Sequence, residues 1–273
     1  MKKIVLFLCV IGATAMMTSC FDRRNHYTAQ GFVFVAVSTQ VEPNVRYGRT
    51  ENGNLITNQQ IQQGTVTVQG QPIPIPPGSF FFATYMWDEE NGREPLSNYH
   101  RADIVTFPGN FIPIPTAELN LTSTVPEDTP DVRYALTGVT RQTPHFIRDA
   151  WWWNDNWVFE FGYFGGEEPP VMRFYKREVT PARQGHPYVA IEIDVRIAEG
   201  FDPGTEALRR SRWHAVALCM ASLREMYEGP HPYNPTNELR VTFNFYERVF
   251  DGQTITSEIR ARSTQQVRWI LNP

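Results

Sequence analysis

Four tryptophans close together in the sequence have the residue type and spacing that most clearly suggest a chemistry, which is stacking. They are Trp151, Trp152, Trp153 and Trp157. An indole left in solvent can stack on a sugar ring or on a partner protein. Neighbouring residues of a strand alternate between its faces, so Trp152 points away from Trp151 and Trp153. Either both faces are covered by protein or one presents indole to solvent. We favour a core or a domain interface, because aromatic stripes in β-proteins usually lie there.

The residues after this group predict a strand that buries aromatic side chains. Every second residue from Trp157 to Tyr163 is aromatic and would share one face of an extended strand. Residues 154–156 (Asn-Asp-Asn) predict a turn, because Asn and Asp tolerate left-handed backbone. We therefore expect a β-hairpin with residues 151–153 in one arm and residues 157–164 in the other.

The spacing of the other reactive residue types does not fit a metal site or a hydrolase. The six histidines form no H-x-x-x-H or H-E-x-x-H pattern, and the sequence has no G-x-S-x-G. Cys219 lies in the run AVALCMASL, which predicts a small buried side chain and not a nucleophile. Acid pairs such as Glu192 with Asp194 could serve glycoside hydrolysis, but these two fall on the outward face of an alternating strand. We predict no enzyme activity, no metal and no cofactor.

Cys20 carries a different chemistry, because it follows an export signal. Residues 1–20 have a basic start at Lys2 and Lys3, a short apolar run and small residues before the cysteine. Residues 17–20 (Met-Thr-Ser-Cys) resemble a bacterial lipobox, which makes Cys20 the lipidated first residue of the mature chain. A plain signal peptide that is cut nearby is the alternative. Lipidation would anchor the protein to a membrane that it does not span.

The residues after Cys20 bear on the location of the protein. Phe21 stands where, by resemblance, an Asp retains lipoproteins in the inner membrane, so we expect the outer membrane. Residues 22–24 (Asp-Arg-Arg) are unlike the acidic stretch that exports some lipoproteins of the Bacteroides group. The periplasmic face is therefore favoured over the cell surface.

The charge of the chain excludes one class of partner. Loss of the signal removes Lys2 and Lys3 and no acids, so 25 cations and 29 anions become 23 and 29, a net charge of −6. This is the wrong sign for a nucleic-acid binder.

The first half of the mature chain predicts a small β-domain over residues 21–119. Strands are expected over residues 30–40, 47–57, 64–69, 79–87, 102–107 and 111–119. Prolines alternate in residues 72–77 (Pro-Ile-Pro-Ile-Pro-Pro), and this pattern predicts an edge or polyproline segment because proline cannot donate to a ladder. The polar, proline-containing residues 120–130 read as an interdomain linker or an exposed loop.

Residues 131–273 predict a second β-domain. Residues 188–197 alternate cleanly, with Val189, Ile191, Ile193, Val195 and Ile197 inward. Asp251-Gly252, between residues 239–250 and 254–262, is the best short hairpin signal in the chain. Residues 205–228 are the one helical candidate on propensity, although residues 213–218 could equally be a buried strand.

The chain resembles the NigD-like lipoprotein family of Bacteroides-type bacteria. The resembling segments are the Cys20 lipobox, residues 47–55, residues 78–88, and residues 148–161, where a "D-x-W, turn, aromatic strand" pattern precedes a Gly-rich turn and a return strand. The resemblance implies an all-β protein with an N-terminal OB-like barrel, a C-terminal β-sandwich and at most one helix. It implies no activity and no catalytic residue.

These observations lead to two hypotheses. The first is a non-enzymatic envelope lipoprotein, anchored to the outer membrane, that binds an envelope protein or assembles with one. The alternative is a glycan-binding lipoprotein with its stacking platform at Trp151, Trp152, Trp153 and Trp157.

Overall fold

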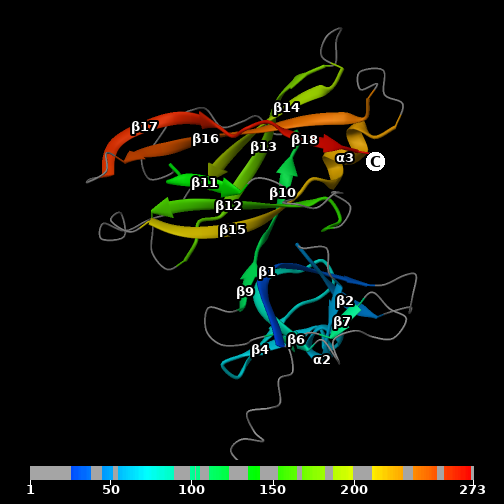
Figure 1. Cartoon of the computed structure of the whole chain (residues 1–273). Coiled ribbons are helices and arrows are strands. Elements are labelled where there is room, and N and C mark those ends of the chain that lie inside the picture. Colours follow the sequence, from blue (N-terminus) through cyan, green and yellow to red (C-terminus); the bar gives the residue numbers. More distant parts are fainter. Residues whose placement is uncertain are drawn as a thin grey trace, which may run out of the picture.

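The computed structural model describes residues 26–37, 45–51, 55–88, 99–101, 103–104, 111–122, 135–141, 153–164, 168–181, 187–198, 211–229, 236–250 and 255–271. Strands dominate these residues, which confirms the all-β prediction (Figure 1). Two short helices occur among them, one more than expected. Within the described residues, no helix is long and apolar enough to cross a membrane.

The first body is built around one curled sheet with the strand order β7-β3-β2-β1-β6-β8, and β9 also pairs with β6. Its strands are β1 (His26–Val37), β2 (Arg46–Thr50), β3 (Leu55–Thr57), β6 (Phe80–Asp88), β7 (Tyr99–Arg101), β8 (Asp103–Ile104) and β9 (Phe111–Ile114). The strands predicted over residues 30–40 and 79–87 are confirmed where these residues are described, whereas residues 47–57 contribute two paired strands, β2 and β3, in place of one. The curl of the sheet gives this body the form of a half-barrel.

A short helix and a proline hairpin complete the first body. Helix α2 (Gln59–Gln63) begins where Asn58 Oδ1 accepts a hydrogen bond from Ile61 N at 2.8 Å, and it ends at Gly64, whose φ of 73° suits glycine. No expected element covered this segment. Strands β4 (Thr65–Val68) and β5 (Gln71–Pro74) form a two-stranded sheet, so the alternating prolines do lie at an edge.

The second body is a β-sandwich whose two layers share one strand. Strand β10 (Thr116–Asn120) runs parallel to β15 through Glu118 and then parallel to β13 from Leu119. The layer next to the first body holds β11 (Gly138–Arg141), β12 (Asn156–Phe164) and β15 (Ser211–Cys219). The other layer holds β13 (Met172–Thr180), β14 (Val189–Ile197), β16 (Glu238–Phe250), β17 (Ile255–Ser263) and β18 (Val267–Ile270).

The chain therefore passes between the bodies earlier than the predicted boundary. Strands β9 and β10 are separated by Pro115 alone, and residues 116–120 belong to the sandwich. Proline lacks the backbone N–H that would continue one ladder, which suits it to a position where the chain changes sheets. Residues 123–130 of the predicted linker lie outside the described residues.

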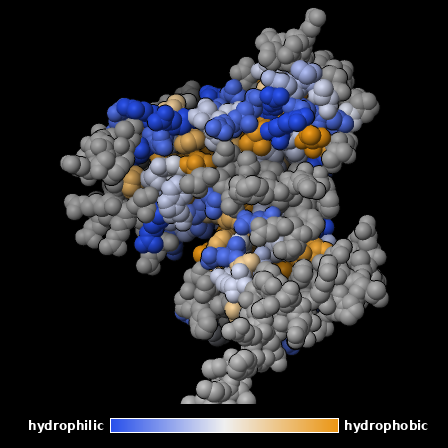
Figure 2. Space-filling view, in the orientation of Figure 1, coloured by the Kyte–Doolittle hydropathy of each residue, from blue (hydrophilic) through white to orange (hydrophobic). Residues whose placement is uncertain are grey.

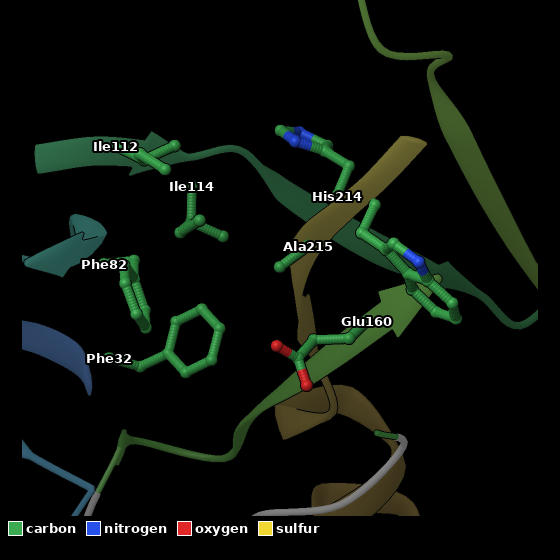
Figure 3. Close-up of a pocket in the computed structure, with 8 residues that line it drawn as sticks. Phe32, Phe82, Ile112, Ile114, Glu160, His214 and Ala215 are labelled. Carbon is green, nitrogen blue, oxygen red and sulfur yellow. The ribbon is translucent and has the colours of Figure 1, made fainter. Parts of the chain in front are cut away.

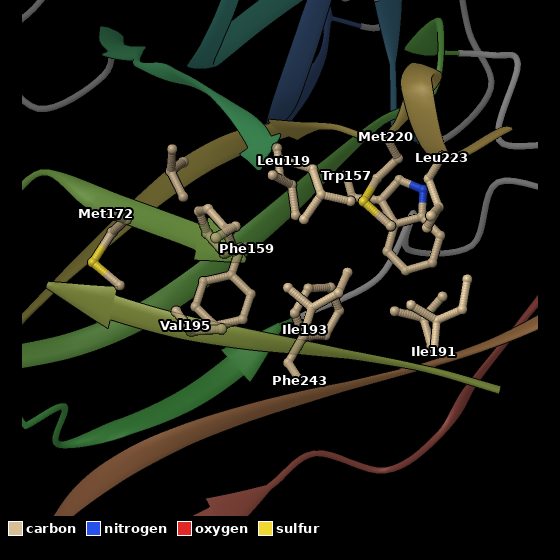
Figure 4. Close-up of a cluster of buried hydrophobic side chains, with 14 of the residues drawn as sticks. Leu119, Trp157, Phe159, Met172, Ile191, Ile193, Val195, Met220, Leu223 and Phe243 are labelled. Atoms are coloured by element: carbon tan, nitrogen blue, oxygen red, sulfur yellow. The ribbon is translucent and has the colours of Figure 1, made fainter. Parts of the chain in front are cut away.

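The sandwich core confirms the aromatic periodicity of β12. Its odd-numbered residues from Trp157 to Tyr163 are at most 3% exposed and pack against the opposite layer (Figure 4). Phe159 contacts Phe174 edge to face, with ring centroids 5.3 Å apart. The five inward residues predicted for β14 are likewise buried.

The turn before β12 was predicted correctly, whereas Trp153, the described residue of the expected hairpin arm, does not lie in a strand. Asn154 and Asp155 adopt positive φ angles of 53° and 60°, as the Asn-Asp-Asn sequence predicted. Trp153 lies in this turn and not in a pairing strand, and β12 pairs with β11 and β15. The described partners of β12 are thus distant in sequence, and the rest of the expected arm, residues 151–152, lies outside the described residues.

The segment predicted as either helix or strand contains one of each. Strand β15 is followed directly by helix α3 (Ala221–Tyr227). Arg224 of α3 fixes the helix to two other parts of the sandwich: it donates to Asp155 Oδ2 at 2.8 Å and to the carbonyl of Leu271. Residues 201–210 lie outside the described residues.

Candidate binding site: a cavity between the two bodies

A cavity of about 270 Å³ lies where the first body meets the sandwich (Figure 3). Side chains from both bodies form its walls, and most of them are apolar. The lining residues are Phe32, Phe82, Ile112 and Ile114 of the first body with Glu160, Trp213, His214 and Ala215 of the sandwich. Pockets lined by apolar side chains with a few polar groups are the usual sites of ligand binding.

A buried cluster beside the cavity holds the two bodies together. Phe80 and Trp153 belong to different bodies and meet edge to face, with ring centroids 5.3 Å apart. Trp153 Nε1 also donates to the Arg49 carbonyl at 3.0 Å. On the sandwich side the cluster contains the small residues Ala215 and Ala217, and small side chains let the bodies approach closely.

Trp213 is an exposed tryptophan, with 55% of its surface accessible. It lies directly across from Gly162 in the β12–β15 ladder. A Cβ added to Gly162 would lie 3.4 Å from the indole, and one added to Gly138 would lie 3.5 Å from it. One edge of the indole therefore packs against the two glycines, where no side chain intervenes, while much of the rest of the indole faces solvent.

Ile112 is the second exposed apolar residue at the cavity, with 41% of its surface accessible. It comes from the first body, so the two bodies each contribute one exposed apolar side chain. On the face shown in Figure 2, hydrophobic side chains appear both on the sandwich and near the junction with the first body. Exposed apolar side chains that line one cavity are typical of an interaction site.

Two titratable residues line the cavity and point in different directions. The Glu160 carboxylate extends toward the rings of Phe32 and Phe82, whereas His214 projects from the opposite side of β15 to Ala215 (Figure 3). His214 meets Phe161 edge to face, and burial lowers the pKa of its imidazole, so this residue is neutral at pH 7. The cavity thus offers one carboxylate among aromatic and aliphatic walls, an arrangement suited to binding.

The two described residues of the predicted stacking platform are buried and not exposed. Trp153 and Trp157 are each 1% exposed. Trp153 lies in the junction between the bodies. Trp157 packs on Trp269 within the sandwich core, with ring centroids 5.2 Å apart. Both indoles are thus covered by protein, the arrangement that we favoured from the sequence. Trp151, Trp152 and Cys20 lie outside the described residues.

The other residues considered for chemistry are Cys219 and the acid pair Glu192 and Asp194. Burial raises the pKa of the Cys219 thiol, so it stays protonated and poorly nucleophilic at neutral pH. Glu192 is exposed as expected, but Asp194 is fully buried beneath Arg196, whose Nη2 lies 2.9 Å from its carboxylate. The expectation of a solvated Asp194 was therefore wrong. Within the described residues, no group of three or more His, Cys, Asp or Glu could hold a metal ion.

Sequence reasoning missed the cavity because its walls meet only in the folded chain. Trp213 was considered only as part of a helical or buried segment. Its exposure depends on Gly162, which lies 51 positions earlier and faces it only through the β12–β15 register. The one local signal is the alternation of Trp213, Ala215 and Ala217, which places a single large residue beside two small ones on one strand face.

Comparisons with known proteins show likeness in fold alone. No family model matches the chain, and no curated protein matches it by sequence. An uncharacterized protein from Parabacteroides merdae superposes with a TM-score of 0.55 at 8% identity, over 90% of this chain and 100% of its own. A candidate lipoprotein from Bacteroides fragilis gives 0.51 at 10% identity, over 90% and 99%. A NigD-like immunity protein from Bacteroides caccae gives 0.44 at 13% identity, over 89% and 97%. The first two likenesses show that this chain shares its fold with those two proteins.

Proposed function

We propose that the protein is a non-enzymatic lipoprotein, anchored by Cys20 to the periplasmic face of the outer membrane, that binds a partner protein at the cavity between its two bodies. The observation that carries this proposal is the pair of exposed apolar residues, Trp213 and Ile112, beside the cavity. Tryptophan is enriched among the residues that dominate binding energy in protein interfaces.

The membrane anchor is supported by the signal segment and by one neighbour in fold. Residues 1–20 carry the basic start, apolar run and lipobox-like end of a lipoprotein signal. The Bacteroides fragilis protein with the same fold is itself described as a candidate lipoprotein. One acyl chain holds a protein to a membrane only marginally, so the several chains of a lipoprotein would make the attachment durable.

Glycan binding is the second candidate, and the structure changes which tryptophan favours it. Trp153 and Trp157 are buried, while Trp213 presents an exposed indole supported by glycines. A sugar ring could stack on that surface. This candidate requires glycan to bind and Trp213→Ala to abolish binding.

The proposal is tested with the full-length chain in its own envelope. Crosslinking and affinity capture of the wild type should yield one stoichiometric envelope protein, and Trp213→Ala should lose most of it. Met226→Ala is the matched control, because Met226 is 41% exposed on α3, outside the cavity. Cys20→Ser should release the protein from the outer-membrane fraction. Equal capture by Trp213→Ala and the wild type would contradict the proposal, and co-purified glycan without a protein would favour the second candidate.

A further inference from the structure

Another cavity, of about 380 Å³, opens where the two layers of the sandwich separate. Strand β10 pairs with β13 through Leu119 and Asn120, whereas residues 116–118 pair with β15 in the other layer (Figure 1). The cavity lies at this fork, and its walls come from β10 and from residues 171–175 at the start of β13. We call it the fork cavity. Its volume is within the range of about 300–1,000 Å³ that is usual for small-molecule sites.

Two opposite charges stand on the rim of the fork cavity. Glu118 and Arg173 directly precede Leu119 and Phe174, the first pair of the β10–β13 ladder, so they face each other across the fork. Both residues are exposed, and no hydrogen bond or ion pair of the Arg173 guanidinium occurs within the described part of the chain. Glu118 accepts a hydrogen bond from the Cys219 thiol. A carboxylate accepts at about four positions, so it can still accept from a ligand.

The inner end of the fork cavity is apolar. Met172 and Phe174 belong to the buried core of the sandwich, and Ala117 packs against that core. Val171, the first residue of the β13 wall, has 68% of its surface accessible. A charged rim above an apolar interior suits a ligand that combines two opposite charges with an apolar part.

The β13 wall of the fork cavity carries an excess of positive charge among the described residues. Arg173 lies directly opposite Arg196 in the β13–β14 ladder, and like charges in that position repel each other. Asp194 pairs with Arg196 at 2.9 Å and with Arg177 at 3.6 Å. Three arginines thus share this one carboxylate, so an additional anion beside Arg173 would be stabilised.

The position of the two rim charges favours a small zwitterion over a long peptide. Glu118 and Arg173 come from neighbouring strands that have only begun to diverge, and paired strands lie about 4.8 Å apart. A free α-amino acid carries its ammonium and its carboxylate on one carbon, so it can contact both side chains at once. The two termini of a long peptide lie too far apart to do so.

We propose that the fork cavity binds a free α-amino acid with an apolar side chain. The fork of the Arg173 guanidinium receives its carboxylate, the Glu118 carboxylate receives its ammonium, and its side chain lies toward Ala117 and Met172. This site belongs to the sandwich alone. It therefore goes beyond the proposed function and does not depend on it.

The test compares three probes that differ by one charge: L-leucine, N-acetyl-L-leucine, which lacks the ammonium, and L-leucinamide, which lacks the carboxylate. Their affinities for the purified full-length chain are measured by isothermal titration calorimetry. Leucine should bind, and each blocked probe should bind at least about tenfold more weakly. Glycine should also bind more weakly than leucine, because it buries no apolar side chain.

Two variants should affect different probes. Glu118→Gln should weaken leucine and leave N-acetyl-leucine unchanged, because that probe has no ammonium. Arg173→Gln should weaken leucine and leave leucinamide unchanged. The matched controls are Glu225→Gln on α3 and Arg260→Gln on β17, two exposed residues outside the fork cavity, and both should bind leucine like the wild type. A misfolded variant would lose all three probes, so this divided pattern distinguishes lost contacts from lost folding.

Three results would overturn the inference. They are no binding of leucine, equal affinity of the wild type for the three probes, and wild-type affinity of Arg173→Gln for leucine. Capture of the envelope partner, measured in parallel, separates the two proposals. Trp213→Ala should lose the partner and still bind leucine, whereas Arg173→Gln should keep the partner and bind leucine weakly.

Discussion

Replacing Trp153 should loosen the junction between the two bodies more than it disturbs either body alone. Its indole is 1% exposed, packs edge to face on Phe80 and donates to the Arg49 carbonyl. Truncation of a buried tryptophan to alanine costs about 3–5 kcal/mol, and the lost hydrogen bond to the Arg49 carbonyl adds to the loss. Since whole domains are stable by only about 5–15 kcal/mol, Trp153→Ala should lose a large part of the stability.

A phenylalanine pair separates the hydrogen bond from the packing. Trp153→Phe keeps a ring but removes the donor to Arg49, so it should cost about 1–3 kcal/mol. Trp157→Phe is the matched control: Trp157 is equally buried, but its Nε1 has no acceptor among the described residues. The difference between the two variants therefore reports the junction hydrogen bond.

The assay is urea unfolding followed by hydrogen exchange with mass spectrometry, which resolves the two bodies. Trp153→Ala should make β1 and β6 exchange at lower urea than β14 and β16, because the contact that couples the bodies is lost. Trp157→Phe should not separate them. An unchanged unfolding midpoint for Trp153→Ala, or an equal loss of protection in both bodies, would refute this reasoning.

Three further outcomes are expected. Arg224→Met should destabilise the sandwich by about 3–5 kcal/mol in urea unfolding, because the Asp155 carboxylate would lose its ion pair and its side chain is only 14% exposed. A loss of stability below ~1 kcal/mol would show that this ion pair is dispensable. Burial acts to raise the pKa of Glu238, but hydrogen bonds and charges from two arginines outweigh it and hold the pKa below the ordinary value of 4.5. The stabilisation is thus present above pH 4.5 and lost as the pH falls through the lower folded pKa, so the wild type should lose more stability than Glu238→Gln between pH 5 and pH 3; parallel curves would contradict this. In protein labelled with 5-fluorotryptophan, Gly162→Ala should shift the ¹⁹F signal of Trp213, because the added Cβ would clash with the Thr137 hydroxyl and lie 3.4 Å from the indole; an unshifted signal would disprove that the indole lies against this glycine.

The parts of the fold that could be predicted are those set by local pattern. The alternation of Trp157 to Tyr163 places a one-sided aromatic strand correctly, since side-chain direction follows directly from strand geometry. Asp251-Gly252 likewise predicts the antiparallel pairing of β16 with β17 that the structure shows. In both cases a few neighbouring residues contain the whole signal.

The parts that could not be predicted depend on contacts between distant residues. The pairing of β12 with β15 joins segments about 50 residues apart, and nothing in either segment specifies the other. Asp194 follows the alternating pattern of an outward residue, yet Arg196 and Arg177 cover it. The candidate site has the same origin, because Ile112 and Trp213 come from different bodies and meet only through the junction.

Site-specific photocrosslinking in cells tests most directly whether the protein binds a partner at the cavity between its two bodies. A benzophenone amino acid replaces Ile112 at the cavity or, as the control, Met226 on α3; both residues are about 40% exposed. We expect one major crosslinked envelope protein from position 112, which is absent from position 226 and greatly reduced when Trp213→Ala is added. Equal crosslinking from both positions, or a crosslink from 112 that persists without Trp213, would contradict it.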